Sequence, residues 1–341
     1  MSNLTGVVAC IDFAQLGHSP ALLAAALKEA MGKTGFIFIK NHGLEQKVKK
    51  MFDISETFFR EETMEEKQRT SYQNNRGYTR VSQETLDPTK PDLDMKEGFN
   101  LAYVSLTDPP HPVQPIPSLL QPHLTSLAEF EQSCFEFCQT LLRAFAVLLD
   151  LNNDFFTREL QHNEESGSIL RFLHYPKVEK GQSVHRTELG LIGLFMIKGS
   201  ADYGSLTLLF QRSSGGEGLQ ILPSTEPLDS PNWQNVGLVE DALLVNIGDA
   251  LELWSGAILK STLHRVVLPP RDEEVDAVQE RFSIAWFNQP KPSASLKTVV
   301  PVSQISENDL SRMERKGVVA GSDITAAQHL QARLASTYKL K

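Results

Sequence analysis

The chain has 341 residues, of which 41% are hydrophobic and 22% are charged, an ordinary composition for a globular protein. A chain of this length can bury a core that is stable without disulfides or structural metals. Its net charge of −9 argues against nucleic acid and anionic membrane surfaces as partners, because proteins that bind these usually present a basic face.

The sequence shows no pattern that would direct the chain to a membrane. Its most apolar stretch, residues 189–197, is shorter than the roughly 20 residues that span a bilayer. The first residues do not combine a basic start with a long apolar run, which is the pattern of a signal peptide. Coiled-coil heptads are absent too. We therefore expect a cytoplasmic monomer.

The three cysteines are Cys10, Cys134 and Cys138, and this odd, sparse set indicates free thiols in a reducing compartment. Cys134 and Cys138 are four residues apart in a helical pattern, so they share one face of the helix. They could form a metal or redox pair. We favour two buried small hydrophobes, the usual state of free cysteine.

The first hundred residues alternate short strands with helices, which predicts an α/β region. The turn Asn41-His42-Gly43 follows a β-branched and aromatic run, and we expect His42 to cap this turn. The Pro-rich segment 108–122 predicts an ordered loop or linker, since proline continues neither a helix nor a central strand. The predicted strands cover residues 7–13 and 35–40, and the predicted helices cover 20–31 and 48–59, with a further helix start at 63–67.

The next segment is helical and the second half of the chain is rich in short strands. Apolar residues at helical spacing predict one long core helix over 118–149, followed by a short helix over 153–160. Many short strands without intervening helices predict a sandwich or jelly roll, and an amphipathic helix over 324–338 follows them. The predicted strands cover residues 169–175, 205–211, 218–222, 242–247, 262–268 and 281–287.

Four polar residues of the β-rich half are candidates for a functional site: Asp202, His264, Arg281 and Ser283. Each has an ordinary structural explanation on its own, such as a turn aspartate or a core histidine. Together they match the groups that a metal site beside a carboxylate-binding site requires. Non-haem iron(II) sites use histidine and carboxylate ligands on one side of the metal. An arginine fork suits a distal carboxylate, and period-2 geometry places Arg281 and Ser283 on one strand face.

Several motifs occur in a fixed order and resemble the isopenicillin N synthase-like family of iron(II)- and 2-oxoglutarate-dependent oxygenases. The resemblance runs from about residue 7 to residue 338, so it is far more specific than any single motif. The motifs lie at residues 35–43, 84–86, 94–99, 205–211, 246–249 leading to Trp254, and 261–267.

The resemblance implies a mixed α+β fold. Its core would be a double-stranded β-helix (jelly roll), with an α/β N-terminal region and a C-terminal helix. The corresponding parts are residues 1–120 for the N-terminal region, 121–167 for a helical bridge, 168–300 for the catalytic core and 301–341 for the helical tail. The implied activity is an oxidoreductase that hydroxylates, desaturates or cyclises a small organic metabolite of secondary metabolism or heterocycle catabolism. Dioxygen is the second substrate.

By motif position, the resemblance makes Asp202 and His264 ligands of Fe(II). Arg281 and Ser283 would hold the far carboxylate of 2-oxoglutarate, and Tyr175 would lie beside this cosubstrate. Tyr78, in a loop near the substrate, is a weaker candidate contact. No further catalytic group is implied beyond the metal site.

The sequence departs from the family at one of the three iron ligands. The family carries a histidine two residues before the carboxylate ligand, and this position is Ser200 here. The segment between Tyr175 and Asp202 is also longer than the family usually carries. Three interpretations stay open: an impaired member that acts as a binding protein, replacement of the ligand by His185, or a defective gene model of an active enzyme.

Overall fold

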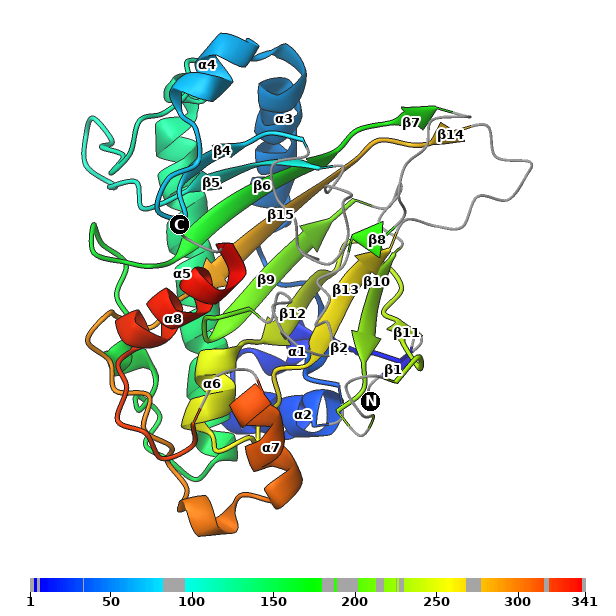
Figure 1. The fold of residues 1–341 in the computed structure, drawn as a ribbon, viewed down its shortest axis with the longest axis vertical. Coiled ribbons are helices and arrows are strands. Elements are labelled where there is room, and N and C mark those ends of the chain that lie inside the picture. The colour runs from blue at the N-terminus through cyan, green and yellow to red at the C-terminus, as the bar shows by residue number, and fades with distance from the viewer. Residues whose placement is uncertain are drawn as a thin grey trace.

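The computed structural model describes residues 3–4, 7–32, 34–81, 96–179, 187–188, 202–212, 218–224, 226, 230–267, 277–315 and 319–338. Two β-sheets lie face to face, and helices cover the outer face of the larger sheet (Figure 1). This arrangement is the predicted jelly-roll core with helical ends.

The larger sheet has nine strands and contains strands from both halves of the chain. All neighbours pair antiparallel except β2 and β3, which are parallel. In spatial order the strands are β1 (Asn3–Leu4), β2 (Ala9–Asp12), β3 (Phe36–Lys40), β12 (Leu243–Ile247), β9 (Leu206–Gln211), β15 (Arg281–Asn288), β6 (Ile169–Tyr175), β5 (Glu97–Leu101) and β4 (Gly77–Thr79).

The smaller sheet faces the β3–β12–β9 part of the larger one. Apolar side chains of both sheets meet between them: Phe36 and Leu244 from the larger sheet pack with Leu219 and Ile221 from the smaller. The order of the smaller sheet is β11 (Gln234–Asn235), β10 (Leu219–Leu222), β13 (Leu263–Val267) and β8 (Thr187–Glu188). A separate ribbon pairs β14 (Ala277–Val278) with β7 (Val178–Glu179).

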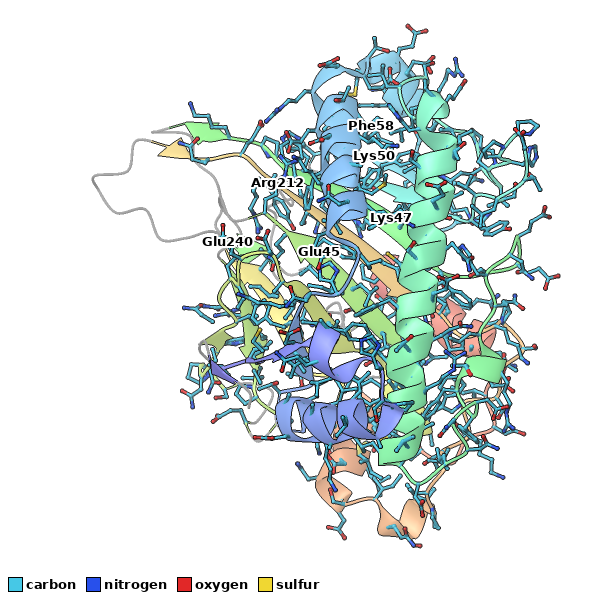
Figure 2. All side chains as sticks on the ribbon, turned by 180° about the vertical axis from the view of Figure 1, so that it is seen from behind. Glu45, Lys47, Lys50, Phe58, Arg212 and Glu240 are labelled. Atoms are coloured by element: carbon cyan, nitrogen blue, oxygen red, sulfur yellow. The ribbon has the colours of Figure 1, made fainter. Side chains whose placement is uncertain are left out.

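Long helices cover the outer face of the larger sheet, as the view from behind shows (Figure 2). Helix α5 (Leu124–Leu148) buries an apolar stripe that includes Cys134 and Cys138, both fully buried free thiols. The prediction that these two cysteines behave as buried hydrophobes is therefore confirmed.

Helix α3 (Glu45–Glu61) packs on β15 and β6 with Phe58 pointing inward.

The remaining helices are shorter, and no helix in the described parts is both long and apolar enough to cross a membrane. They are α1 (Phe13–Leu16), α2 (Pro20–Met31), α4 (Met64–Arg69), α6 (Asp249–Trp254), α7 (Glu307–Arg315), α8 (Ala326–Tyr338) and the 3₁₀ turns η1 (Gln121–His123), η2 (Thr157–Glu159) and η3 (Val302–Gln304).

Three expectations about local structure have definite outcomes. The imidazole Nδ1 of His42 accepts a hydrogen bond from the backbone N–H of Leu44 at 3.1 Å, so its capping role is confirmed. The long helix begins at residue 124 rather than 118, because the Pro-rich loop and η1 come first. The helix predicted over 153–160 was wrong. Only η2 forms there, after a turn in which the Asn152 side chain accepts from the backbone N–H of Asp154.

Candidate active site

Strand β15 directs Arg281 and Ser283 toward the space between the two sheets. Its residue Ala285 lies opposite Leu209 of β9, and Leu209 packs against the apolar cluster between the sheets. Directly opposed residues of an antiparallel pair share a face, and side chains alternate along a strand. Arg281 and Ser283 are therefore on the inward face with Ala285, as the sequence predicted.

Tyr175 lies directly opposite Arg281 across β6 and β15. The guanidinium carbon of Arg281 is 3.7 Å from the centre of the Tyr175 ring, a close cation–π contact. The Nη2 atom of Arg281 is buried and makes no hydrogen bond with any residue that the structure describes. A buried charged donor without an acceptor is costly, and a carboxylate suits this fork best.

His264 enters the same space from the smaller sheet. It lies opposite Ile221 of the cluster between the sheets, and its ring centre is 5.5 Å from that of Phe36. Its Nδ1 is 3.2 Å from the carbonyl oxygen of Thr262. A hydrogen bond to that oxygen places the proton on Nδ1 and leaves the lone pair of Nε2 available to a metal.

Asp202 lies in the loop before β9, with its carboxylate beside His264. The Asn246 amide donates to Oδ2 of Asp202 at 2.5 Å, and the same oxygen is 3.9 Å from Nε2 of His264. This separation is too long for a hydrogen bond. Metal bonds to such donors are about 2.0–2.2 Å, so one ion can contact both atoms. Asp202 and His264 therefore fit two positions of an iron site.

The third ligand position falls outside the described residues, as do both Ser200 and His185. Among the residues that the structure does describe, no third histidine, cysteine, aspartate or glutamate joins Asp202 and His264 in a metal-binding group. The donors present, one carboxylate and one imidazole, fit iron(II).

The Asp202–His264 pair and the Arg281–Tyr175 pair lie toward opposite ends of one inward-facing strip. Asn246, which holds Asp202, lies opposite Thr207, and Thr207 lies opposite Phe287 of β15. Phe287 is six residues beyond Arg281 on the same face, which corresponds to about 20 Å along an extended strand. The strip between the two pairs contains Ser283 and Ala285 from β15.

Comparisons with known proteins decide the family. Residues 8–121 match the N-terminal domain of the non-haem dioxygenase in morphine synthesis, and residues 166–290 match the 2OG-Fe(II) oxygenase superfamily. The 2-oxoglutarate-Fe(II) type oxidoreductase ppzD of Metarhizium majus is 30% identical, over 97% of this chain and 95% of its own. The chain belongs to the 2OG-Fe(II) oxygenase superfamily.

Solved structures agree with this assignment. A full-length Neurospora crassa protein, crystallised in complex with alpha-KG, has a TM-score of 0.72 and 27% identity, covering 98% of this chain and all of that one. The same protein in complex with alpha-KG and thymine gives a TM-score of 0.72 and 28% identity. This oxygenase is therefore a dioxygenase that uses Fe(II) and 2-oxoglutarate, as the motifs predicted.

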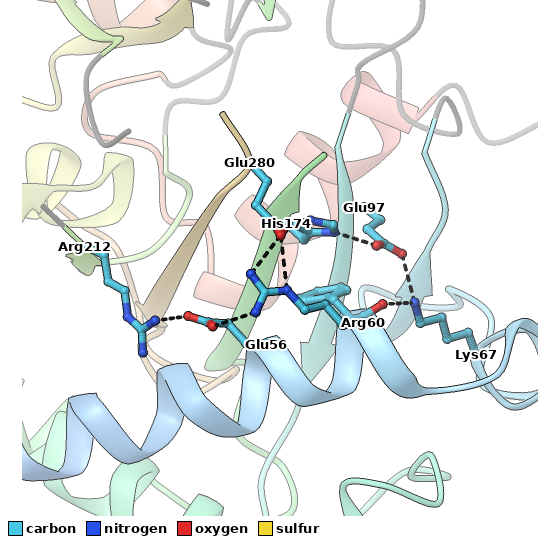
Figure 3. A network of polar contacts seen from close by, with 8 residues as sticks. Glu56, Arg60, Lys67, Glu97, His174, Arg212 and Glu280 are labelled. Atoms are coloured by element: carbon cyan, nitrogen blue, oxygen red, sulfur yellow. Dashed lines mark hydrogen bonds and ion pairs between the residues drawn. The ribbon is translucent and has the colours of Figure 1, made fainter. Parts of the chain in front are cut away.

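A buried polar network lies on the other face of β15 and β6 from Arg281 and Tyr175, on the helix side of the sheet (Figure 3). His174 stacks on Phe282 with ring centres 4.5 Å apart, and its Nδ1 is 2.7 Å from Glu97. Lys67 lies 3.4 Å from the same carboxylate. Burial opposes ionisation of Glu97, but the His174 and Tyr78 hydrogen bonds and the Lys67 charge outweigh it and lower its pKa.

Tyr78 belongs to this network, and the expectation that it contacts the substrate was wrong. Its hydroxyl donates to Glu97 at 2.5 Å, and its ring packs edge-on to Phe58 on the helix side of the sheet. Alternation along β4 explains the error, because Tyr78 points away from the space between the sheets.

The sequence pattern did not assign roles to Asn246 and Glu97, although both lie in motifs that carried the resemblance. Asn246 occupies the inward face of β12, where an amide within an apolar strand has to find a polar partner. That is the signal that could have paired it with Asp202. Glu97 is a carboxylate in a fully buried strand, and burial of this kind predicts a partner too.

Proposed function

We propose that Asp202 and His264 are iron ligands and that Arg281, Ser283 and Tyr175 bind 2-oxoglutarate in this oxygenase. The observation that carries the proposal is that an Asp202–His264 pair 3.9 Å apart shares one inward-facing strip with Arg281, whose buried Nη2 has no hydrogen-bond partner among the described residues. The family assignment supports it, because this superfamily is named for its use of Fe(II) and 2-oxoglutarate.

When bound, the iron and 2-oxoglutarate would supply the oxidising chemistry with dioxygen as the oxidant: one oxygen atom of dioxygen ends in succinate as carbon dioxide is lost, and the other oxidises the substrate. The protein supplies orientation. The Thr262 carbonyl oxygen holds the His264 ring in one tautomer, and Asn246 fixes the Asp202 carboxylate. Arg281 neutralises and orients the distal carboxylate, while Tyr175 keeps the guanidinium from turning away.

The substrate in this proposal is a small polar metabolite, such as a nitrogen heterocycle or an amino-acid derivative. Asn100 lies opposite Arg171 across β5 and β6, on the face that carries Arg281, and its buried Oδ1 has no hydrogen-bond partner among the described residues, so it can accept a hydrogen bond from such a molecule. Relatives whose names specify a substrate include a proline hydroxylase, buaE of Petromyces alliaceus, and the Neurospora crassa protein was crystallised with thymine. We further propose that the oxygenase is a cytoplasmic monomer.

Succinate formation from 2-oxoglutarate, with and without added Fe(II), tests the assignment. His264→Ala should abolish turnover while the fold is kept, and His111→Ala, at an exposed histidine, is the matched control. Arg281→Met should raise the KM for 2-oxoglutarate by about 10- to 100-fold, since a hydrogen bond to a charged group contributes about 1.5–3 kcal/mol. Full activity of the His264 variant would remove this residue from the metal site.

A Ser200→His variant addresses the departure from the family. An imidazole at this position supplies the ligand type that iron(II) prefers. A large gain in iron affinity and turnover would mean that the natural chain is impaired. Unchanged values would mean that another group already completes the site.

A further inference from the structure

The carboxylate of Asp249, the first residue of α6, is completely buried and connects three separate segments of the oxygenase. Its backbone N–H donates to the carbonyl oxygen of Asp202 at 2.7 Å. Its Oδ1 accepts from the Ser261 hydroxyl at 2.8 Å. Its Oδ2 is 3.1 Å from Nη2 of Arg333 in α8. One residue therefore joins the loop of the carboxylate ligand, the segment that leads to the histidine ligand, and the C-terminal helix.

The connection to Asp202 is tight because Gly248 allows close packing of the backbone. A Cβ atom at Gly248 would collide with the carbonyl oxygens of Gly204 and Asp202. The backbone N–H of Gly248 also donates to the carbonyl oxygen of Ser205 at 2.9 Å. A displacement of Asp249 is thus transmitted to the Asp202 loop by direct contact.

The connection to His264 is made through Ser261, three residues before it. Besides its hydroxyl contact with Asp249, Ser261 donates its backbone N–H to Glu252 of α6 at 3.1 Å. The next residue, Thr262, provides the carbonyl oxygen beside Nδ1 of His264. Helix α6 therefore sets the start of the strand on which His264 lies.

Arg333 brings the C-terminal helix into this arrangement. It is only 5% exposed, and its guanidinium carbon is 5.0 Å from the ring centre of Tyr203, the neighbour of Asp202. Arg333 thus contacts the loop that carries Asp202 directly at Tyr203. It is connected to the same loop a second time through Asp249, whose backbone N–H donates to Asp202. Helix α8 is in this way attached to both sides of the metal site.

A buried ion pair is not needed for stability alone, since well-packed apolar side chains serve as well or better. The Asp249–Arg333 pair adds a fixed position for the two backbone segments that Asp249 contacts, the loop with Asp202 and the segment with Ser261. We propose that Asp249 and Arg333 are positioning residues of the iron site, so that docking of α8 sets the spacing of Asp202 and His264. The proposal rests on the assignment of these two residues as iron ligands.

The decisive variant replaces both members of the pair, Asp249→Asn with Arg333→Met, because it leaves no buried charge without a partner. Arg333→Met alone is the second variant, and Arg333→Lys, which keeps the charge, is the conservative one. Arg312→Met is the matched control. Arg312 is also a buried arginine of the C-terminal segment, but its Nη1 donates to the Ser224 carbonyl oxygen rather than to Asp249.

Two measurements are made on each full-length variant: Mn(II) affinity from the loss of the free-ion electron paramagnetic resonance signal, and the urea midpoint of unfolding without metal. We expect the double variant to unfold near the wild-type midpoint and to bind Mn(II) about tenfold more weakly, the lower range for partners that orient metal ligands. Arg333→Lys should recover part of this loss, and Arg312→Met should bind Mn(II) like the wild type.

The outcomes separate this inference from the proposed function. Wild-type Mn(II) affinity in the folded double variant overturns the positioning role, as does an equal loss in Arg312→Met. If instead His264→Ala binds Mn(II) as tightly as the wild type, the ligand assignment itself is wrong, whatever the Arg333 variants show.

Discussion

His162 gives the sharpest prediction about stability. Its ring stacks on Phe135 at 5.2 Å and meets Tyr103 and Trp286 edge-on, and neither ring nitrogen has a hydrogen-bond partner among the described residues. Burial lowers its pKa from 6.5 to about 4. Below about pH 6.5, His162 is therefore protonated in the unfolded chain but not in the folded chain. The free energy of unfolding falls as the pH is lowered from 6.5 to about 4, by up to about 3 kcal/mol.

The variant His162→Phe keeps the aromatic packing and removes the titrating group. Urea unfolding of wild type and variant from about pH 7 to about pH 4.5 should show the two free energies diverging as the pH falls, with the variant increasingly more stable. His111→Phe, at an exposed histidine, should follow the wild type at every pH. Parallel curves for wild type and His162→Phe would refute the reasoning.

Two further predictions concern buried groups on the helix side of the sheet. Glu97→Gln leaves Lys67, which is only 4% exposed, without its carboxylate partner. In urea titrations the free energy of unfolding should therefore fall by about 3 kcal/mol. A loss well under about 1 kcal/mol would contradict this. Burial raises the pKa of the Cys134 and Cys138 thiols. A thiol reagent should therefore modify only Cys10 in the folded oxygenase, and all three cysteines once it is unfolded.

The sequence predicted best those elements whose pattern is local and periodic. Helix α2 and strand β6 have the predicted bounds, because capping by Ser19 marks the start of the helix and a short run rich in apolar residues marks the strand, both without tertiary help. Helix α6 was missed, since it has only six residues and all six are buried, so no exposed face marks its period. Helix α7 was missed although Ser306 and Asp309 form a capping arrangement that could have indicated its start.

The candidate site followed from motif order, whereas its supporting contacts could not. Nothing in the spacing of Asp249 and Arg333, 84 positions apart, indicates that they touch. Such contacts depend on how α8 folds back across the core, which is a tertiary property. The same applies to Glu97 and His174, which meet only because β5 and β6 pair.

The strand order of the larger sheet bears on synthesis of the chain. Strand β3 ends at Lys40, but its neighbour β12 begins only at Leu243, so one edge of β3 stays bare while some two hundred further residues emerge from the ribosome. Pairings this distant in sequence form late and slowly, and a bare apolar edge invites association with other chains. Nascent copies of this oxygenase should therefore depend on chaperone protection until β12 has been made.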